Sequence, residues 1–152
     1  MYRFAPVAAW FVALGSLAHA QTVDFELRTY PLCPIVFAGG SARTPAPGVP
    51  ARQFVTIQNG SKRTAAAVTF QQTVSQGSKT GIVAIERVAI VIPPGEKRRV
   101  SMAVADMSGR LESARQSGES PGRPVLSVVA VEFLDGTGWN APTGTGAAAA
   151  KE

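Results

Sequence analysis

The chain has 152 residues and a formal net charge of +5, and it contains one histidine and one cysteine. A chain of this length supports one domain with a single hydrophobic core. The single cysteine excludes a disulfide within the chain, and the positive charges are mostly scattered rather than gathered into a long basic run.

Residues 1–20 have the pattern of a secretory signal peptide. Arg3 supplies a positive charge, an apolar run extends from Phe4 to Leu17, and Ala18-His19-Ala20 predicts cleavage before Gln21. The alternative is a membrane anchor, but a spanning helix needs about 20 predominantly apolar residues, and this run is shorter and contains proline and glycine. We therefore expect an exported protein, periplasmic or extracellular, with no transmembrane segment after cleavage.

Removal of this segment also removes His19, so the mature chain contains no imidazole. Ser-His-Asp and Cys-His catalytic arrangements are then excluded, as are the usual histidine-containing zinc sites. A Ser-Lys nucleophile remains open, and so does a pair of carboxylates such as Glu86 with Glu132. We predict that the protein is not an enzyme and that it has no cofactor and no metal site.

The first mature segment alternates apolar and polar residues, which predicts a strand over residues 22–30. The side chains predicted to share its apolar face are Val23, Phe25 and Leu27. Cys33 follows among apolar residues and prolines, and we expect its side chain to be buried, since free cysteine is among the most buried residue types. A reactive thiol or an intermolecular bridge is the alternative. Residues 38–51 are rich in glycine and proline and predict an extended connector.

Further runs predict strands in residues 51–58, 65–74, 82–92 and 125–133. The side chains predicted to share a face are Val55 with Ile57, then Ala66, Val68 and Phe70, and later Val129, Val131 and Phe133. The β-branched run at 82–92 predicts one bent strand or two short ones. Between the first two runs, Asn59-Gly60 predicts a turn with positive φ, and Asn59-Gly60-Ser61 also matches a glycosylation acceptor.

A basic triplet follows the proline- and glycine-containing turn at residues 93–95, and it is a candidate anion-binding site. Its members are Lys97, Arg98 and Arg99. Its partner would be an anionic surface, a polysaccharide or a nucleic acid. The alternation that follows, with Val100, Met102 and Val104 apolar, instead predicts an ordinary strand whose basic side chains face solvent. No aromatic residue interleaves with the triplet, so we do not expect nucleic acid as a partner.

The segment at 131–142 raises the most specific question about a ligand, because it brings together Asp135, Trp139 and Asn140. Asp135-Gly136 is a favoured turn pair, the Asp135 carboxylate can accept hydrogen bonds from turn amides, and Trp139 can cover the core from a short return strand. The rival hypothesis is a sugar-stacking site that uses Trp139 with Asp135 or Asn140. Residues 105–124 predict a long polar loop that contributes to partner binding, and residues 143–152 predict a flexible tail.

About seven short strands separated by turns predict an all-β domain over residues 21–142, a single immunoglobulin-like or fibronectin-like antiparallel β-sandwich. An open barrel is the alternative. We predict a non-catalytic exported protein that mediates contacts with another envelope or extracellular protein. The alternative function is a carbohydrate- or anion-binding module that uses Trp139 or Lys97–Arg99, and an enzyme based on carboxylates is less favoured.

Overall fold

A computed structural model of the chain describes residues 25–43, 52–76, 79–104, 116–118 and 122–142. The described part of the chain is all-β, as the sequence predicts, and its strands form two sheets. No helix among the described residues is long and apolar enough to cross a membrane. The predicted signal peptide, most of the loop at 105–124 and the tail at 143–152 lie outside the described residues.

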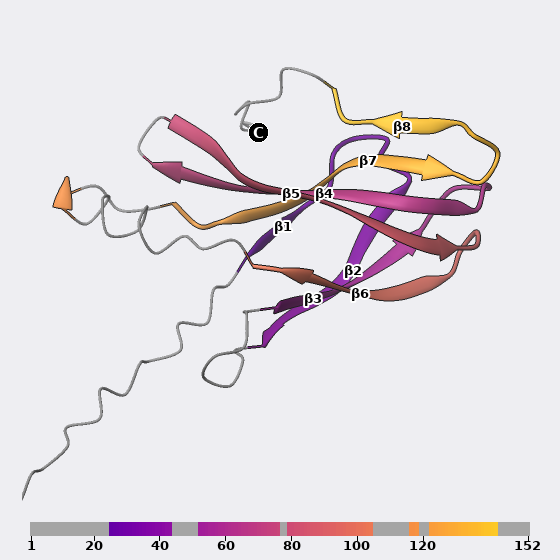
Figure 1. Cartoon of the computed structure of the whole chain (residues 1–152), viewed down its shortest axis with the longest axis horizontal. Helices are drawn as coiled ribbons and strands as arrows, with labels where there is room; N and C mark the ends of the chain where they lie inside the picture. The colour runs from indigo at the N-terminus through magenta and orange to yellow at the C-terminus, as the bar shows by residue number, and fades with distance from the viewer. Residues whose placement is uncertain (1–24, 44–51, 77–78, 105–115, 119–121, 143–152) are drawn as a thin grey trace, which may run out of the picture.

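The larger sheet, sheet A, has the strand order β1-β7-β4-β5, and the short strand β8 also pairs with β7 (Figure 1). Its strands are β1 (Glu26–Arg28), β4 (Ala65–Gln76), β5 (Lys79–Ile92), β7 (Val125–Phe133) and β8 (Gly138–Asn140). The pairing of β1 with β7 is parallel, so the prediction of a purely antiparallel architecture is wrong at this edge. The β1 strand can pair in this direction because it is distant from β7 in the chain and needs no tight turn to reach it.

The smaller sheet, sheet B, is antiparallel and has the order β2-β3-β6. Its strands are β2 (Ile35–Arg43), β3 (Arg52–Asn59) and β6 (Lys97–Ala103). The connector predicted at 38–51 is therefore wrong over residues 38–43, which belong to β2. A register shift occurs between Phe37 and Gly39, and a Cβ on Gly40 would lie 3.0 Å from a methyl carbon of Leu27. Glycine is thus used here for close packing inside a strand, a role that composition does not distinguish from a linker.

Apolar side chains of both sheets meet in one hydrophobic cluster. Sheet B contributes Ile35, Val55, Ile57, Val100 and Met102, and sheet A contributes Val68, Phe70, Val74, Ile92, Leu126, Val128, Val131 and Phe133. The rings of Phe37 and Phe70 lie 6.4 Å apart across the two sheets. The amide Nε2 of buried Gln72 donates a hydrogen bond of 2.7 Å to the carbonyl oxygen of Ala103, so a polar group also joins the sheets.

The predicted alternation is confirmed in β3, where Val55 and Ile57 are fully buried. It is wrong at two places where the pairing register shifts. In β4 the buried alanines are Ala65 and Ala67 rather than Ala66, and the register shifts between them. In β7, Val128 is fully buried while Val129 is only partly buried, beside a second shift. A β-bulge adds one residue to a strand and so reverses the faces of the residues beyond it.

The predicted turns differ in their backbone geometry. Gly95 and Gly136 have φ values of 77° and 80°, the left-handed region that favours glycine. Gly60 does not adopt positive φ, so that part of the Asn59-Gly60 prediction is wrong. Its amide instead donates a hydrogen bond of 2.8 Å to the carbonyl oxygen of Pro34, which joins the start of the β3–β4 loop to the segment before β2.

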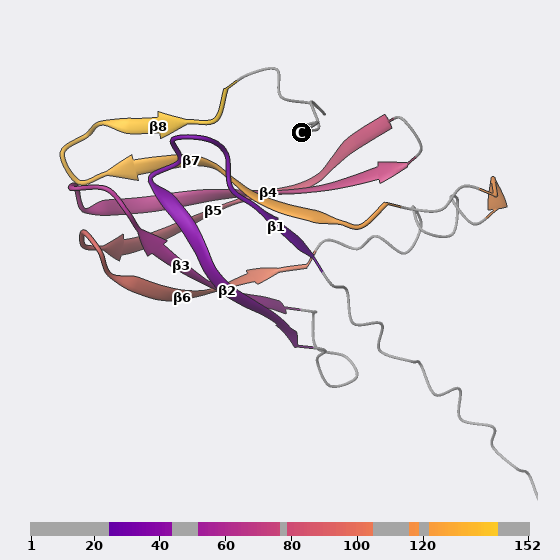
Figure 2. The same cartoon turned by 180° about the vertical axis from the view of Figure 1, so that it is seen from behind.

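Strands β4 and β5 form a long hairpin, and β5 is one continuous strand of 14 residues rather than two. The end of β4 and the start of β5 project past sheet B along the long axis of the molecule in both views (Figures 1 and 2). A register shift between Gln72 and Thr73 lies within this pairing. In the described part of the chain β5 pairs only with β4 and is an edge strand.

Candidate functional site

The carboxylate of Asp135 is held by hydrogen bonds inside the β7–β8 turn. Its Oδ1 accepts a hydrogen bond of 2.9 Å from the backbone amide of Thr137 and a second, short one from the Thr137 hydroxyl. The amide of Phe133 donates to the carbonyl oxygen of Thr137 at 2.9 Å and closes the turn. These bonds, chiefly the one from the Thr137 hydroxyl, lower the pKa of Asp135. The turn geometry thus accounts for a carboxylate at this position.

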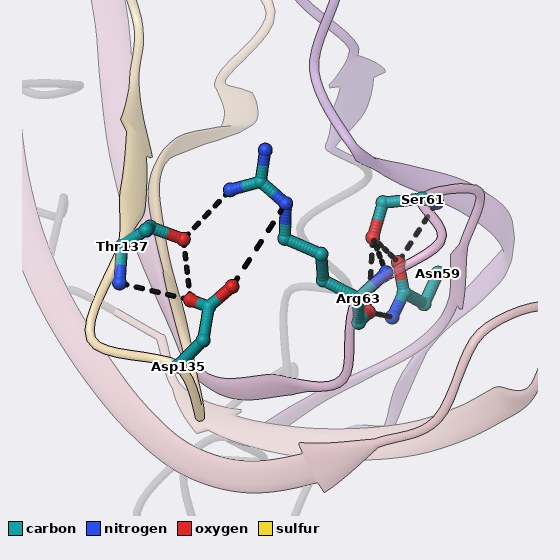
Figure 3. Close-up of polar contacts among 5 residues, drawn as sticks. All are labelled: Asn59, Ser61, Arg63, Asp135 and Thr137. Carbon is teal, nitrogen blue, oxygen red and sulfur yellow. Dashed lines mark hydrogen bonds and ion pairs between the residues drawn. The ribbon is translucent and has the colours of Figure 1, made fainter.

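Arg63 of the β3–β4 loop reaches over this turn (Figure 3). Its Nη1 donates a hydrogen bond of 2.7 Å to the Thr137 hydroxyl, and its Nε lies 4.0 Å from Oδ2 of Asp135. Its guanidinium carbon also lies 5.3 Å from the centre of the Phe133 ring. The guanidinium group of Arg63 therefore contacts both the Asp135 carboxylate and the Phe133 ring. These contacts join the β3–β4 loop to the β7–β8 turn, which is distant from it in the chain.

Asn59 organises the other side of the same loop (Figure 3). Its side chain is fully buried, and its Nδ2 donates to the carbonyl oxygens of Arg63 at 2.7 Å and Ile92 at 2.8 Å. Its Oδ1 accepts from the amide and the hydroxyl of Ser61 at 3.0 and 2.7 Å. Both amide hydrogens are used, so the acceptor motif Asn59-Gly60-Ser61 offers no free side-chain amide in the folded protein. We call Asn59, Ser61, Arg63, Asp135 and Thr137 the loop cluster.

The three residues of the predicted sugar site point in different directions. Trp139 pairs with Val131 in β8 and packs, partly buried, against the hydrophobic core. Asn140 is exposed and pairs with Ala130, and successive residues of a strand face opposite sides of the sheet. Asp135 is engaged in the loop cluster. A stacking site needs an open aromatic face with polar groups on the same side, and these three side chains do not supply that arrangement.

The basic triplet lies at the start of β6, as predicted, and its three members have different surroundings. Lys97, Arg98 and Arg99 are exposed, while Val100 and Met102 are buried. Arg98 forms an ion pair of 2.5 Å with Glu96, and its charge is thereby balanced within the chain. The Arg99 guanidinium carbon instead lies 4.7 Å from the centre of the Phe54 ring on β3. Phe54 is the aromatic neighbour that the triplet lacks in sequence.

Arg52 is a functional candidate that the sequence patterns did not indicate. It is exposed at the start of β3, and its Nε donates a hydrogen bond of 2.7 Å to the hydroxyl oxygen of Ser101 on β6. The residue follows a proline-rich segment and has no basic neighbour within the predicted strand at 51–58, so no local charge pattern marks it. Its even spacing from Phe54 and Thr56 along a strand is the one signal that places it on their face.

Cys33 is partly buried and packs against the core. Its Sγ lies 3.0 Å from the carbonyl oxygen of Ile35, to which the thiol donates. Burial raises the pKa of the Cys33 thiol to about 11. A thiol with such a pKa is protonated near neutral pH and is a poor nucleophile.

The carboxylates of Glu86 and Glu132 do not meet. Glu132 accepts two hydrogen bonds of 2.6 Å from Arg87, which lower its pKa, and it pairs in register with Ala67. Glu86 accepts a hydrogen bond of 3.1 Å from the backbone amide of Ala103 in sheet B. Glu86 and Arg87 are consecutive residues of β5, so their side chains lie on opposite faces of sheet A. Because Arg87 contacts Glu132, the sheet separates Glu132 from Glu86. No group of three His, Cys, Asp or Glu side chains suited to a metal ion occurs among the described residues.

Comparison with known proteins adds no family. The sequence matches no protein-family model, and it matches no curated protein significantly.

Proposed function

We propose that this protein is an exported, non-catalytic β-sandwich of the immunoglobulin-like kind that mediates protein–protein contacts in the cell envelope or outside the cell. The signal-peptide pattern at residues 1–20 supports export. The sandwich is supported by two sheets that share one hydrophobic cluster, and by a chain that passes between them at β1–β2, β3–β4, β5–β6 and β6–β7.

The observation that carries the proposed contact is the unprotected edge of β5. Residues 81–85 have the sequence Gly-Ile-Val-Ala-Ile, with no charged residue and no proline, and they pair with residues 71–74 of β4 across a register shift. Ile82 is 54% exposed and Ile85 is 60% exposed. Natural sheets commonly protect such edges with charges, prolines or a covering segment. The edge strand β6, with Lys97, Arg98 and Arg99 at its start, has that protection.

An edge of this kind binds another protein by strand addition. An extended segment of the partner pairs with the free backbone groups of β5, and its side chains pack against Ile82 and Ile85. The remainder of β5 is less available, because Glu86 receives the amide of Ala103 from β6. We therefore place the contact at residues 81–85.

The test compares a double substitution with a matched single one. Ile82→Lys with Ile85→Lys introduces two charges at the proposed contact. Val91→Lys introduces the same side chain on the same strand at a position that is 54% exposed, but at the other end of β5. Each protein is used to capture partners from the envelope fraction of the producing cells, with quantitative mass spectrometry.

We expect a specific partner that the unmodified protein and the Val91 variant both recover, and that the double variant recovers at least about tenfold less. Circular dichroism verifies that all three proteins are folded. Equal recovery by all three proteins, or an equal loss in both variants, would contradict a contact at residues 81–85.

A further inference from the structure

Positively charged side chains gather on the outer face of sheet B, the face turned away from the hydrophobic cluster. In β3 the buried residues are Gln53, Val55, Ile57 and Asn59, so the side chains between them point outward. Those outward residues pair directly with residues of β6, and cross-strand partners share a face. The pairs are Arg52 with Ala103, Phe54 with Ser101, Thr56 with Arg99, and Gln58 with Lys97.

Two guanidinium groups on this face approach the same cross-strand pair. Arg52 donates through Nε to the hydroxyl oxygen of Ser101 at 2.7 Å. From the other direction, the guanidinium carbon of Arg99 lies 4.7 Å from the centre of the Phe54 ring. Since Phe54 and Ser101 are partners in register, both cations lie beside one point on the sheet. The Ser101 hydroxyl accepts from Arg52 and still has its own hydrogen to donate.

The charge on this face is not balanced by acidic residues of the described chain. Each described acidic side chain has a partner elsewhere: Glu26 pairs with Arg28, Glu96 with Arg98, Glu132 with Arg87, Asp135 with Arg63, and Glu86 accepts from the amide of Ala103. Arg52, Lys97 and Arg99 form no ion pair among the described residues. Like charges held close on one sheet face repel one another, and an anion bound between them relieves that repulsion.

The other side chains of this face indicate which kind of anion fits. Thr56 and Ser101 offer hydroxyl groups, which match sugar hydroxyls and carboxylates, while the side-chain amide of Gln58 already donates to the carbonyl oxygen of Gly95 at 3.2 Å. The face offers few apolar anchors, because Phe54 is covered by Arg99, and Val36, at the rim on β2 and 38% exposed, is a single aliphatic side chain. Protein interfaces depend on buried aromatic and aliphatic anchors, and membrane-binding surfaces insert apolar side chains. The outer face of sheet B is therefore poorly suited to bind a protein or a membrane.

We propose that the outer face of sheet B is a binding site for an acidic, uronic-acid-containing polysaccharide. Arg52 and Arg99 bind carboxylates of the polysaccharide, because the planar guanidinium group matches the shape of a carboxylate. Lys97 adds a further positive charge at the end of the site. Arg98, which the sequence grouped with its neighbours, is not part of the site because Glu96 balances it. The site lies on the other sheet from the β5 edge and does not depend on the proposed protein contact.

The test is a titration of the whole mature protein with polygalacturonate, followed by calorimetry, with neutral dextran as the uncharged reference. Poly-L-glutamate and vesicles containing phosphatidylglycerol represent an acidic protein and an anionic membrane. The key variant carries Arg52→Gln and Arg99→Gln. A matched control carries Arg28→Gln and Lys62→Gln, which removes the same charge from exposed positions off this face.

We expect polygalacturonate to bind, dextran not to bind, and added salt to weaken the binding. The key variant is expected to bind about tenfold more weakly, since two charged contacts are lost, while the control variant binds nearly as the unmodified protein does. The variant with Ile82→Lys and Ile85→Lys is expected to retain full binding, which separates this site from the β5 contact.

Three results would overturn the proposal. They are failure of the native protein to bind polygalacturonate, an equal loss of binding in the key and control variants, and tighter binding of poly-L-glutamate or of the vesicles. All four substituted positions are exposed, so the variants are expected to fold, and their unfolding midpoints are measured alongside.

Discussion

The environment of single side chains determines which of them can act chemically, and Cys33 is the clearest case. The residue is flanked by Leu32 and Pro34, and its thiol is held between the core and the carbonyl oxygen of Ile35. Sequence predicted burial from the residue type and its apolar neighbours. The structure adds the hydrogen-bond acceptor and the direction of the pKa shift, both of which depend on the fold of the segment around it.

We predict that alkylation of Cys33 by iodoacetamide is slow in the native protein at pH 8. Because the thiolate is the reactive form and burial raises the pKa to about 11, the rate is expected to increase with pH until about pH 11. In urea the same thiol is expected to titrate near its ordinary value of 9.0. Mass spectrometry of the alkylated fraction against time measures both rates. A native rate that levels off near pH 9 would show that the thiol is not desolvated.

At the scale of elements, loops and strands depend on contacts that cross the chain. The β3–β4 loop and the β7–β8 turn are joined by Arg63, whose partners are Asp135 and Thr137. Neither segment shows this pairing in its own sequence, where Asp135-Gly136 indicates only a turn. Asn59 likewise matches a turn motif, but its role is to satisfy carbonyl groups of Arg63 and Ile92.

We predict that Asn59→Ala lowers the free energy of unfolding by about 2–3 kcal/mol, because the carbonyl oxygen of Ile92 loses its donor in a buried position and that of Arg63 keeps only the Ser61 hydroxyl. Asn140→Ala removes the same group from an exposed position and is expected to cost less than about 0.5 kcal/mol. Urea denaturation followed by fluorescence measures both. A similar loss in the two variants would mean that the amide of Asn59 does not stabilise the fold.

Strand positions were predicted well where the alternation is regular. In β3 and β6 each predicted buried residue within the strand is buried, because one face of each strand packs on the core without interruption. In β4 and β7 the prediction fails only at Ala66 and Val129, next to the register shifts, where one extra residue changes the face; the other predicted residues of these strands are buried. The part of β2 that follows Phe37 was predicted to be a connector and not a strand. The reason is that Gly39 and Gly40 have low strand propensity.

At the scale of the whole molecule, stability depends on the contact between the two sheets. Phe70 of β4 belongs to the cluster, is 1% exposed, and packs against Phe37 from the other sheet. Phe54 is an aromatic residue of sheet B that points away from the core and is covered by Arg99 instead. The two phenylalanines therefore provide a matched comparison of the inner and outer faces.

We predict that Phe70→Ala lowers the free energy of unfolding by about 3–5 kcal/mol through lost burial and an unfilled cavity. Phe54→Ala is expected to cost less than about 1.5 kcal/mol, since the ring is only partly buried. Urea denaturation measures both, and Phe70→Leu provides a milder variant if the alanine variant does not fold. A larger loss for Phe54 than for Phe70 would contradict the assignment of inner and outer faces.

By itself the sequence determined the all-β class and the position of most strands, since apolar and polar residues alternate with a period of two and turn residues separate the runs. It also predicted the local use of Asp135 in a turn. Only the tertiary structure decided which residues from distant strands face one another: Arg52 with Arg99 beside the Phe54–Ser101 pair, Arg63 with Asp135, and Glu86 apart from Glu132. The physical reason is that strand pairing and bulges set the register, and register is a property of neighbouring strands rather than of any one segment.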